Sequence, residues 1–246
     1  MCGPLVSSVR LGQVNVFLGT LVFAALFQET SRRAAPAGAL LAAAFLTKVT
    51  PVLYSLDLLA RRRLVTFLCF ASGTGLLVGL SVWSSGLEPW RRFAEISMQP
   101  KPFEPVMSLH GLLSRLGPQV GAAPAWIQGL WAAAALGLLL TVVLWLLRQK
   151  PEAADPVRNW SALTLLGLLA SPLTWHHHYY LALLPLSYLV LRAQPSRARA
   201  VAVALALLTL LRYPGALHAL KPLCAVAALG LVLWGPVTAR PPRASS

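Results

Sequence analysis

Three consecutive histidines, His176 to His178, lie in the stretch SPLTWHHHYYLALLP (171–185), between two apolar runs. Imidazole is a common zinc ligand, and it also donates hydrogen bonds to phosphate or sugar oxygens. Successive helical residues point about 100° apart, so the three rings of a regular helix cannot face one ion. No Cys, Asp or Glu lies in this stretch to complete a metal site. We therefore expect no metal here, and one or two imidazoles that point into a polar cavity.

Aromatic residues flank the histidines, namely Trp175, Tyr179 and Tyr180. Such side chains gather at the membrane–water interface, and their rings also stack on sugar faces. An aromatic belt with histidines that bind no ligand is the structural alternative.

Two further polar sites interrupt apolar sequence. Lys48 lies between apolar segments, where an ammonium is costly unless it reaches water or an anion. A lipid phosphate is a natural partner, although a lysine near a helix end also extends to headgroups. GQVN (12–15) places Gln13 and Asn15 at a helix start, where free N–H groups favour an anion or a sugar hydroxyl. Plain helix capping is the alternative there.

Composition identifies an integral membrane protein. Of 246 residues, 57% are hydrophobic and 11% charged, and the mean hydropathy is +0.67. Soluble domains carry roughly 25% charged residues. The net charge of +14 would suggest nucleic acid as the partner of a soluble protein, but here it indicates cationic loops beside anionic membrane lipids. We expect no nucleic-acid partner. The three cysteines form no disulfide framework.

Apolar runs define the elements that must position these residues. They cover 14–28, 34–60, 64–83, 124–147, 159–174, 179–191, 201–211 and 222–235. A helix needs roughly 20 residues to cross a bilayer, so the shorter runs must pack against one another or end at a protein-lined cavity. We expect an all-α, polytopic transmembrane bundle of about eight or nine membrane helices, some of them short and broken. Residues 1–237 would form one transmembrane domain and 238–246 a disordered cytoplasmic tail.

The run 34–60 decides the topology, because arginines precede it at 32–33 and follow it at 61–63. Lys48 and Pro51 interrupt its middle, and proline disfavours helical geometry in the residue before it. We expect two short helices, about 36–47 and 51–60, that turn at Lys48. Both arginine clusters then face the cytoplasm, as the positive-inside rule prefers.

The same alternation places the polar groups on the extracytoplasmic side of a multi-pass cell-membrane protein. The loop 84–123 belongs to this side, with an amphipathic interfacial helix in 84–107 and a short helix at 108–117. His110 and Arg115 of the short helix are further candidate contacts for phosphate or sugar. The chain then begins outside, and we expect further helices upstream.

Several of these stretches, in this order, resemble the integral membrane glycosyltransferases of family 87. GQVN (12–15) is similar to their GQxN motif, and AGALLAAAFLTKVTPVLYSLDLLARRR (37–63) to their AGxxxGxAxxxKxxPxLxxxxLLxRRR block. SPLTWHHHYYLALLP (171–185) resembles their SPxSWxHHxxxLLP stretch. The resemblance covers about residues 10 to 192. It implies a GT-C-like, here partial, fold.

For function, the resemblance implies transfer of a hexose, mannose above all, from a polyprenyl-phosphate sugar to a lipid or glycan acceptor. A carboxylate would deprotonate the acceptor hydroxyl while cations stabilise the departing phosphate. Lys48, His176 and His177 match the family motif and are assigned to the donor phosphate, with Gln13 and Asn15 as secondary candidates. Trp175 is an additional candidate for the sugar, His178 is left without a role, and no metal or other cofactor is required.

Two departures from the family pattern stand out. Val106 and Met107 replace two amides that commonly precede Ser108. The family's catalytic aspartate lies upstream of GQxN, and the aspartates of this chain, Asp57 and Asp155, fall on the predicted cytoplasmic side. The catalytic base therefore stays unassigned.

Two other functions compete with the enzyme. The first is a truncated, non-catalytic membrane subunit or lipid-phosphate-binding protein, which would keep the donor contacts without the chemistry. The second is a transporter, whose broken helices near a polar site look similar. Transporters often show internal repeats and intramembrane acids, and neither is clear in this sequence.

Overall fold

The structure, a computed structural model, describes residues 14–98, 106–172, 174, 176–192, 196–210 and 220–235. Gln13, Trp175 and the predicted tail 238–246 lie outside these residues, as do the side chains of His176 and His177.

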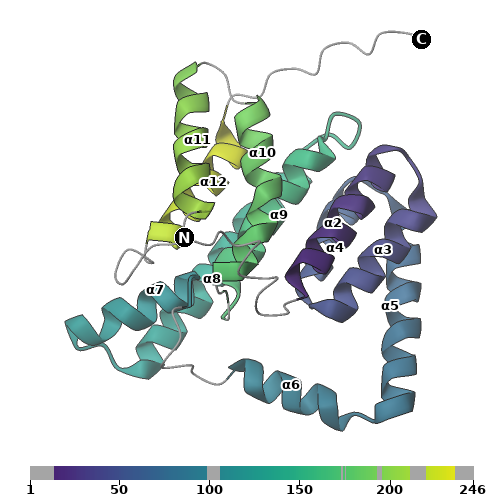
Figure 1. Ribbon diagram of the computed structural model, residues 1–246, viewed down its shortest axis with the longest axis horizontal. Helices are drawn as coiled ribbons and strands as arrows, with labels where there is room; N and C mark the ends of the chain where they lie inside the picture. Colours follow the sequence, from purple (N-terminus) through teal and green to yellow (C-terminus); the bar gives the residue numbers. More distant parts are fainter. Residues whose placement is uncertain are drawn as a thin grey trace.

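Every regular element in the described residues is a helix, which confirms the all-α class (Figure 1). In chain order they are α2 (Asn15–Thr30), α3 (Ala34–Thr47), η1 (Thr50–Leu53), α4 (Tyr54–Ala60), α5 (Leu64–Ser85), α6 (Glu88–Met98), α7 (Leu109–Leu116), η2 (Gly117–Val120), α8 (Pro124–Leu147), α9 (Pro156–Ala170), η3 (His176–Ala182), α10 (Leu183–Arg192), α11 (Ser196–Leu210) and α12 (Leu220–Trp234). Here η denotes a 3₁₀-helix. The apolar runs of the sequence thus correspond to these helices.

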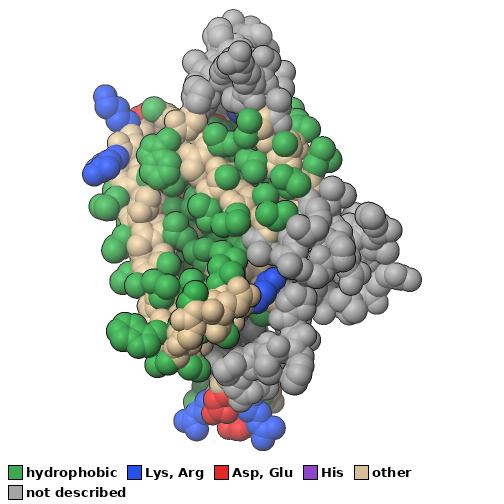
Figure 2. Space-filling model, turned by 90° about the vertical axis from the view of Figure 1, so that its left-hand side faces the viewer, with side chains coloured by type: hydrophobic (Ala, Val, Ile, Leu, Met, Phe, Trp, Pro, Cys, Tyr) green, Lys and Arg blue, Asp and Glu red, His purple; other side chains and the backbone are tan. Residues whose placement is uncertain are grey.

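Two helices, α5 and α8, are long and apolar enough to cross a membrane, with 22 and 24 residues. Only 11% of the most apolar stretch of each is buried, so neither resembles the core helix of a soluble protein. Figure 2 shows hydrophobic side chains over much of one face, with charged side chains gathered mainly at its upper and lower ends. An apolar surface of this extent suits lipid better than water.

The chain reverses at Lys48, as the sequence predicts. Lys48 follows the last turn of α3 in an extended conformation, with φ −164° and ψ 139°. Pro51 then lies in the first turn of η1, where its missing N–H costs nothing. The returning helix α4 brings Arg61 and, just beyond it, Arg63 back to Glu29 near the end of α2. Both arginine clusters therefore lie at one end of the bundle.

The helix α9 forms the centre of the bundle. Most of its side chains are buried, and it packs against α8, α10 and α12 as well as α2 and α4 (Figure 1). Its start is fixed by Asp155, whose carboxylate accepts a hydrogen bond from the Val157 N–H at 2.9 Å. It ends at Ser171, which precedes Pro172 and is extended with ψ 133°. The chain then leads from the core into the histidine segment.

Both helices predicted between 84 and 123 are present, as α6 and α7. Gly86, with φ 74°, separates α5 from α6, and α6 extends to the left from the lower end of α5 in Figure 1. A residue with positive φ turns the chain here, and glycine adopts this φ without strain.

Candidate functional site

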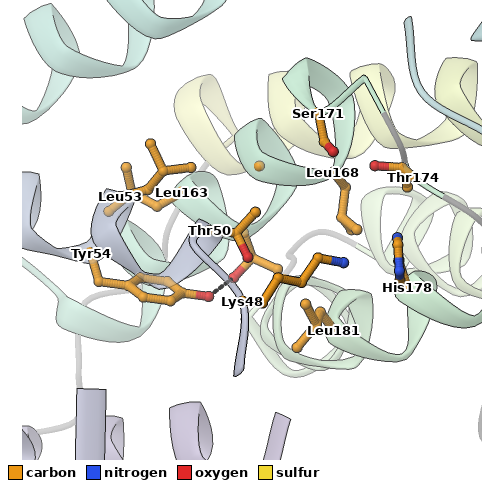
Figure 3. Close-up of a pocket in the computed structure, with 12 residues that line it drawn as sticks. Lys48, Thr50, Leu53, Tyr54, Leu163, Leu168, Ser171, Thr174, His178 and Leu181 are labelled. Atoms are coloured by element: carbon orange, nitrogen blue, oxygen red, sulfur yellow. Dashed lines mark hydrogen bonds between the residues drawn. The ribbon is translucent and has the colours of Figure 1, made fainter. Parts of the chain in front are cut away.

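A small cavity lies between the two halves of the chain, at the end of α3. Its polar lining comes from Lys48 and Thr50 at the chain reversal, Tyr54 and Thr164 beside it, Ser171 and Thr174 after α9, and His178 in η3. Apolar side chains of Leu53, Leu163, Leu168 and Leu181 complete the wall. In Figure 3 the Lys48 ammonium points toward His178, and the Ser171 and Thr174 hydroxyls lie on the same side.

The α4–α9 contact holds one wall of this cavity in place. The hydroxyl groups of Tyr54 and Thr164 are 2.9 Å apart and share a hydrogen bond. The Tyr54 ring also stacks on Trp160, with ring centroids 4.6 Å apart. Because both aromatic side chains are buried, they fix the distance between α4 and α9 next to Lys48.

The opposite wall depends on Tyr179, which is fully buried. Its hydroxyl donates a hydrogen bond to the Met107 carbonyl at 2.8 Å, and the Met107 N–H donates to the Thr174 carbonyl. The segment before α7 thus binds Thr174 and Tyr179, which lie on either side of the three histidines. Met107 is one of the two residues that depart from the resembled pattern. It is 1% exposed, and its backbone N–H and carbonyl make these two hydrogen bonds.

His178 lies in the cavity, although the sequence left this residue without a role. The segment His176–Ala182 is a 3₁₀-helix, which has about three residues per turn instead of 3.6. The direction of the His178 imidazole therefore differs from that on an α-helix. Of the histidines whose side chains the structure describes, His110 and His178, His178 is the one that lines this polar cavity.

The charged groups that line the cavity are basic. Lys48 and His178 are the basic groups of its lining, and its described residues include no carboxylate. Burial lowers the pKa of Lys48 to about 7, because little water reaches the ammonium. An anion beside Lys48 would restore its charge. The cavity volume is about 20 Å³, which is enough for a water or a single phosphate oxygen but not for a sugar.

Asn15 lies on the side of α2 that packs against the histidine segment. It is 2% exposed, and its amide nitrogen has no hydrogen-bond partner among the described residues. One turn later on the same face, Gly19 meets Tyr180 so closely that a Cβ at Gly19 would lie 2.5 Å from the Tyr180 ring. The structure therefore brings the asparagine of GQVN to the η3 side of the bundle.

His110 and Arg115 of α7 do not line the cavity. His110 Nε2 is 3.1 Å from the Gln128 amide, and its ring lies edge-on to Trp131. Arg115 donates to the carbonyls of Val106 and Gly111 and so stabilises the turn before α7.

Comparison with known proteins shows which family this chain belongs to. Residues 1–174 match the model of glycosyltransferase family 87. The chain belongs to this family. Two similar relatives are polyprenol-phosphate-mannose-dependent alpha-(1-2)-phosphatidylinositol mannoside mannosyltransferases. The relative from Mycolicibacterium smegmatis is 32% identical over 72% of the chain and 41% of its own length. The one from Mycobacterium tuberculosis is 31% identical over the same shares.

A third relative, from Mycolicibacterium smegmatis, is a polyprenol-phosphate-mannose-dependent alpha-(1-2)-phosphatidylinositol pentamannoside mannosyltransferase. It is 32% identical over 80% of the chain and 47% of its own length. The family 87 chain thus spans less than half the length of these relatives. No solved structure matches it. Family membership and the exposed apolar helices α5 and α8 together identify a membrane protein.

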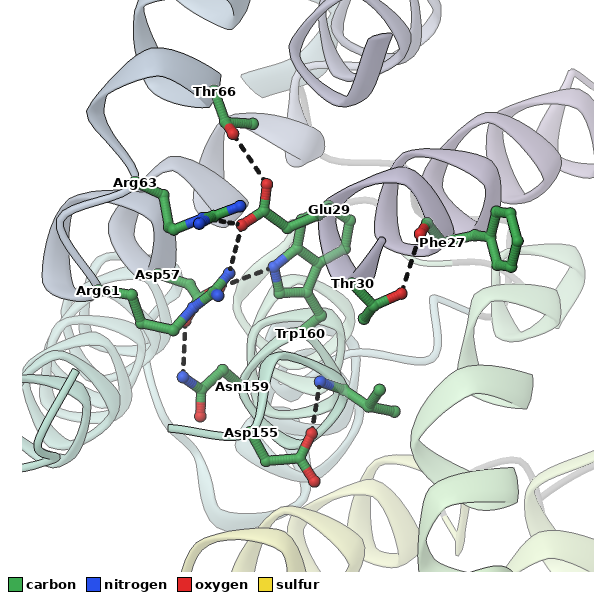
Figure 4. Close-up of polar contacts among 11 residues, drawn as sticks. Phe27, Glu29, Thr30, Asp57, Arg61, Arg63, Thr66, Asp155, Asn159 and Trp160 are labelled. Atoms are coloured by element: carbon green, nitrogen blue, oxygen red, sulfur yellow. Dashed lines mark hydrogen bonds and ion pairs between the residues drawn. The ribbon is translucent and has the colours of Figure 1, made fainter. Parts of the chain in front are cut away.

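The aspartates of this family 87 chain have structural partners at the opposite end of the bundle from Lys48. Asp57 is fully buried and accepts hydrogen bonds from Arg61, Asn159 and Trp160 (Figure 4). Asp155 caps α9. Neither carboxylate lines the Lys48 cavity.

Glu29 belongs to the same buried cluster as Asp57, and its role was missed in the sequence. Its carboxylate accepts from Arg63 at 2.6 Å, from Thr66 at 2.8 Å and from Arg61 at 3.3 Å (Figure 4). The signal was an acid at the end of an apolar run, just before the first arginine cluster.

Lys221 is a second basic residue near the site that the sequence did not single out. It is fully buried, its ammonium donates to the Thr209 carbonyl, and it lies 5.2 Å from the centroid of the Tyr179 ring. A cation over an aromatic face attracts the ring, so Lys221 helps to hold Tyr179 against η3.

Proposed function

We propose that the protein takes part in mannose transfer from a polyprenyl-phosphate-mannose donor to a lipid acceptor of the phosphatidylinositol mannoside type. Two observations support this. The relatives that share most of this chain are mannosyltransferases dependent on polyprenol-phosphate-mannose. The observation that carries the proposal is that Lys48 and His178, from segments far apart in sequence, line one cavity whose described residues include no carboxylate.

The cavity would act on the leaving group. As the acceptor hydroxyl attacks the anomeric carbon, the bond from that carbon to the phosphate oxygen breaks, and the polyprenyl phosphate leaves with the electron pair. Negative charge then grows on the phosphate, and a fixed ammonium with imidazole and hydroxyl donors stabilises it. One phosphate oxygen fits within the cavity, while the sugar and the polyprenyl chain would lie at its opening. The proposal requires no metal ion and no other cofactor.

The residues proposed for the donor are Lys48, His176 and His177, and we add His178 because it lines the cavity with Lys48. Gln13 and Asn15 remain secondary candidates, and the buried amide of Asn15 on the η3 side of α2 supports its inclusion. The additional candidates for donor or acceptor are His110, Arg115 and Trp175. The base that deprotonates the acceptor is not assigned to a residue.

We propose a multi-pass, GT-C-like arrangement of about eight or nine membrane helices, with residues 1–237 as one transmembrane domain. The loop 84–123 and the cavity would face the extracytoplasmic side, and the tail 238–246 the cytoplasm. Lys48 and the first arginine cluster lie at opposite ends of α3, whose 14 residues span about 21 Å. The positive-inside rule favours arginines on the cytoplasmic side, which supports a cavity on the other side.

The proposal is tested by replacing Lys48 in membranes that contain the protein. Radiolabelled polyprenyl-phosphate-mannose and a phosphatidylinositol mannoside acceptor are added, and both donor binding and labelled product are measured. Lys48→Ala is expected to lower transfer at least tenfold, which corresponds to about 1.4 kcal/mol of transition-state stabilisation. Lys150→Ala is the matched control, because Lys150 is exposed in the loop after α8.

Equal transfer by Lys48→Ala and Lys150→Ala, at equal protein levels, would contradict the proposed role of the cavity. Donor binding that depends on Lys48, but with no product from the unaltered protein, would favour the non-catalytic lipid-phosphate-binding alternative.

A further inference from the structure

Helices α2 and α4 end in the same type of turn, at the arginine end of the bundle. After α2, the Arg32 N–H donates to the Glu29 carbonyl and the Arg33 N–H to the Gln28 carbonyl. After α4, the N–H groups of Arg62 and Arg63 make the equivalent bonds to Leu59 and Leu58. These pairs of bonds define the Schellman motif, in which the residue after the C-cap adopts a left-handed conformation.

Arginine occupies the left-handed position of both turns. Arg32 has φ 60° and Arg62 has φ 56°, and these are the non-glycine residues with positive φ in the described part of the chain. Glycine or asparagine usually takes this position, because a Cβ strains the backbone there. Strain that recurs in two turns side by side is a reason to look for a function of the two guanidinium groups.

The two turns line one open cavity of about 510 Å³. The charged residues of its lining are Arg32, Arg61, Arg62, Arg63, Glu29 and Glu152. The basic groups outnumber the acids by four to two.

Within this cavity the arginines divide into two pairs. Arg61 and Arg63 are bound to the buried carboxylates of Asp57 and Glu29, as Figure 4 shows. Arg32 and Arg62 are exposed and form no ion pair within the described residues. The first pair anchors the two turns, and the second pair offers its charge at the surface.

We propose that this cavity binds the phosphate group of an anionic phospholipid headgroup, with Arg32 and Arg62 as its main contacts. Planar guanidinium groups bind phosphate oxygens in pairs of parallel hydrogen bonds. The site is independent of the proposed mannose transfer and lies at the opposite end of α3 from Lys48.

The neighbouring surface favours a lipid over free phosphate. Immediately after Arg63, the first turns of α5 expose Leu64, Val65 and Leu68, whose relative accessibilities are 55%, 63% and 62%. Acyl chains attached to a phosphate in the cavity would lie along these side chains. A headgroup phosphate therefore gains contacts that inorganic phosphate lacks.

The test measures thermal unfolding of the whole chain purified in a neutral detergent. Short-chain phosphatidylglycerol, short-chain phosphatidylcholine and inorganic phosphate are titrated separately. We expect phosphatidylglycerol to raise the Tm in a saturable way, because a ligand that binds only the folded state stabilises it. The other two should have little effect over the same concentrations.

Arg32→Gly with Arg62→Gly is the informative variant, since glycine relieves the left-handed strain while it removes both charges. We expect this double variant to fold with an unchanged or higher Tm and to bind phosphatidylglycerol at least tenfold more weakly. Arg32→Asn with Arg62→Asn, which also tolerates this backbone, should behave alike. Arg91→Ala with Arg92→Ala, on α6, removes the same charge elsewhere and should keep the wild-type response.

Equal phosphatidylglycerol affinity in the double variant and the wild type would overturn the proposal. An equal response to phosphatidylcholine would contradict the preference for an anionic headgroup. An equal response to inorganic phosphate would contradict the claim that the ligand is a lipid.

Discussion

Lys48 and His178 line the same cavity, although Lys48 ends α3 and His178 belongs to η3. The central helix α9 joins them. On one side Thr164 bonds to Tyr54, which follows Lys48 by less than two turns, and on the other side α9 ends at Ser171, from which the chain leads to His178. The two basic groups therefore depend on the same helix for their relative position.

Replacement of His178 tests whether the structure identifies the relevant imidazole. His178→Ala should lower mannose transfer at least fivefold, because one hydrogen-bond donor to the departing phosphate is lost. This corresponds to about 1 kcal/mol of transition-state stabilisation. Lys150→Ala is again the control, since Lys150 is exposed in the loop after α8. Initial rates in membranes at matched protein level measure the difference. Equal rates for the two variants would contradict a role for His178.

The lowered pKa of Lys48 predicts how donor binding changes with pH. Only the protonated ammonium attracts phosphate, and with a pKa of about 7 its population falls as pH rises. Between pH 6 and pH 8 the apparent donor affinity should fall about tenfold, as expected for one proton taken up on binding. Lys48→Arg keeps its charge over this range and should flatten the profile. Radiolabelled donor binding at each pH measures the effect, and parallel profiles for wild type and variant would refute this origin.

Asp57 should be essential for stability, because it compensates a buried arginine. Asp57→Ala leaves Arg61 without its main partner, and it leaves the side-chain N–H groups of Asn159 and Trp160 without their acceptor. We expect a loss of about 3–5 kcal/mol in the free energy of unfolding. Glu88→Ala, which breaks the exposed Glu88–Arg92 pair, should cost at most about 1 kcal/mol. Chemical unfolding in neutral detergent, followed by tryptophan fluorescence, distinguishes these cases. Equal midpoints for the two variants would show that the buried pair is dispensable.

Two glycines offer a matched test of helix packing. A Cβ at Gly38 of α3 would lie 2.7 Å from backbone atoms of Thr66 and Phe70 in α5, so Gly38→Ala must push the helices apart. We expect a cost of about 1–3 kcal/mol. Gly75 of α5 has nothing within 4 Å, and Gly75→Ala should be neutral or stabilise the helix by up to about 1 kcal/mol. The same unfolding assay separates the two, and a harmless Gly38→Ala would contradict the close α3–α5 contact.

Much of the fold could be predicted from local sequence. The apolar runs correspond to the helices, and Pro51 after Lys48 predicted the reversal that returns α4 to the first arginine cluster. The amphipathic pattern after residue 84 predicted α6 and α7. These features depend on hydrophobic periodicity and on the geometry of proline, both of which act over a few residues.

The details of the site were less predictable, because they depend on distant partners. From the sequence we expected one or two histidines to point into a polar cavity and gave His178 no role. That His178 lines the cavity depends on the 3₁₀ geometry of η3 and on the Tyr179–Met107 bond. Glu29 and Asp57 gave little local signal, since their arginine partners only meet them when α4 packs beside α2.

The sequence by itself determined an all-helical membrane protein, its family, and the reversal at Lys48, since composition, motifs and proline geometry are local properties of the chain. The tertiary structure alone decided which side chains share a cavity and which acids are already paired. The physical reason is that a charged ammonium or carboxylate is costly to bury unless it is paired. How deeply each group is buried depends on how α9 packs against both halves of the bundle.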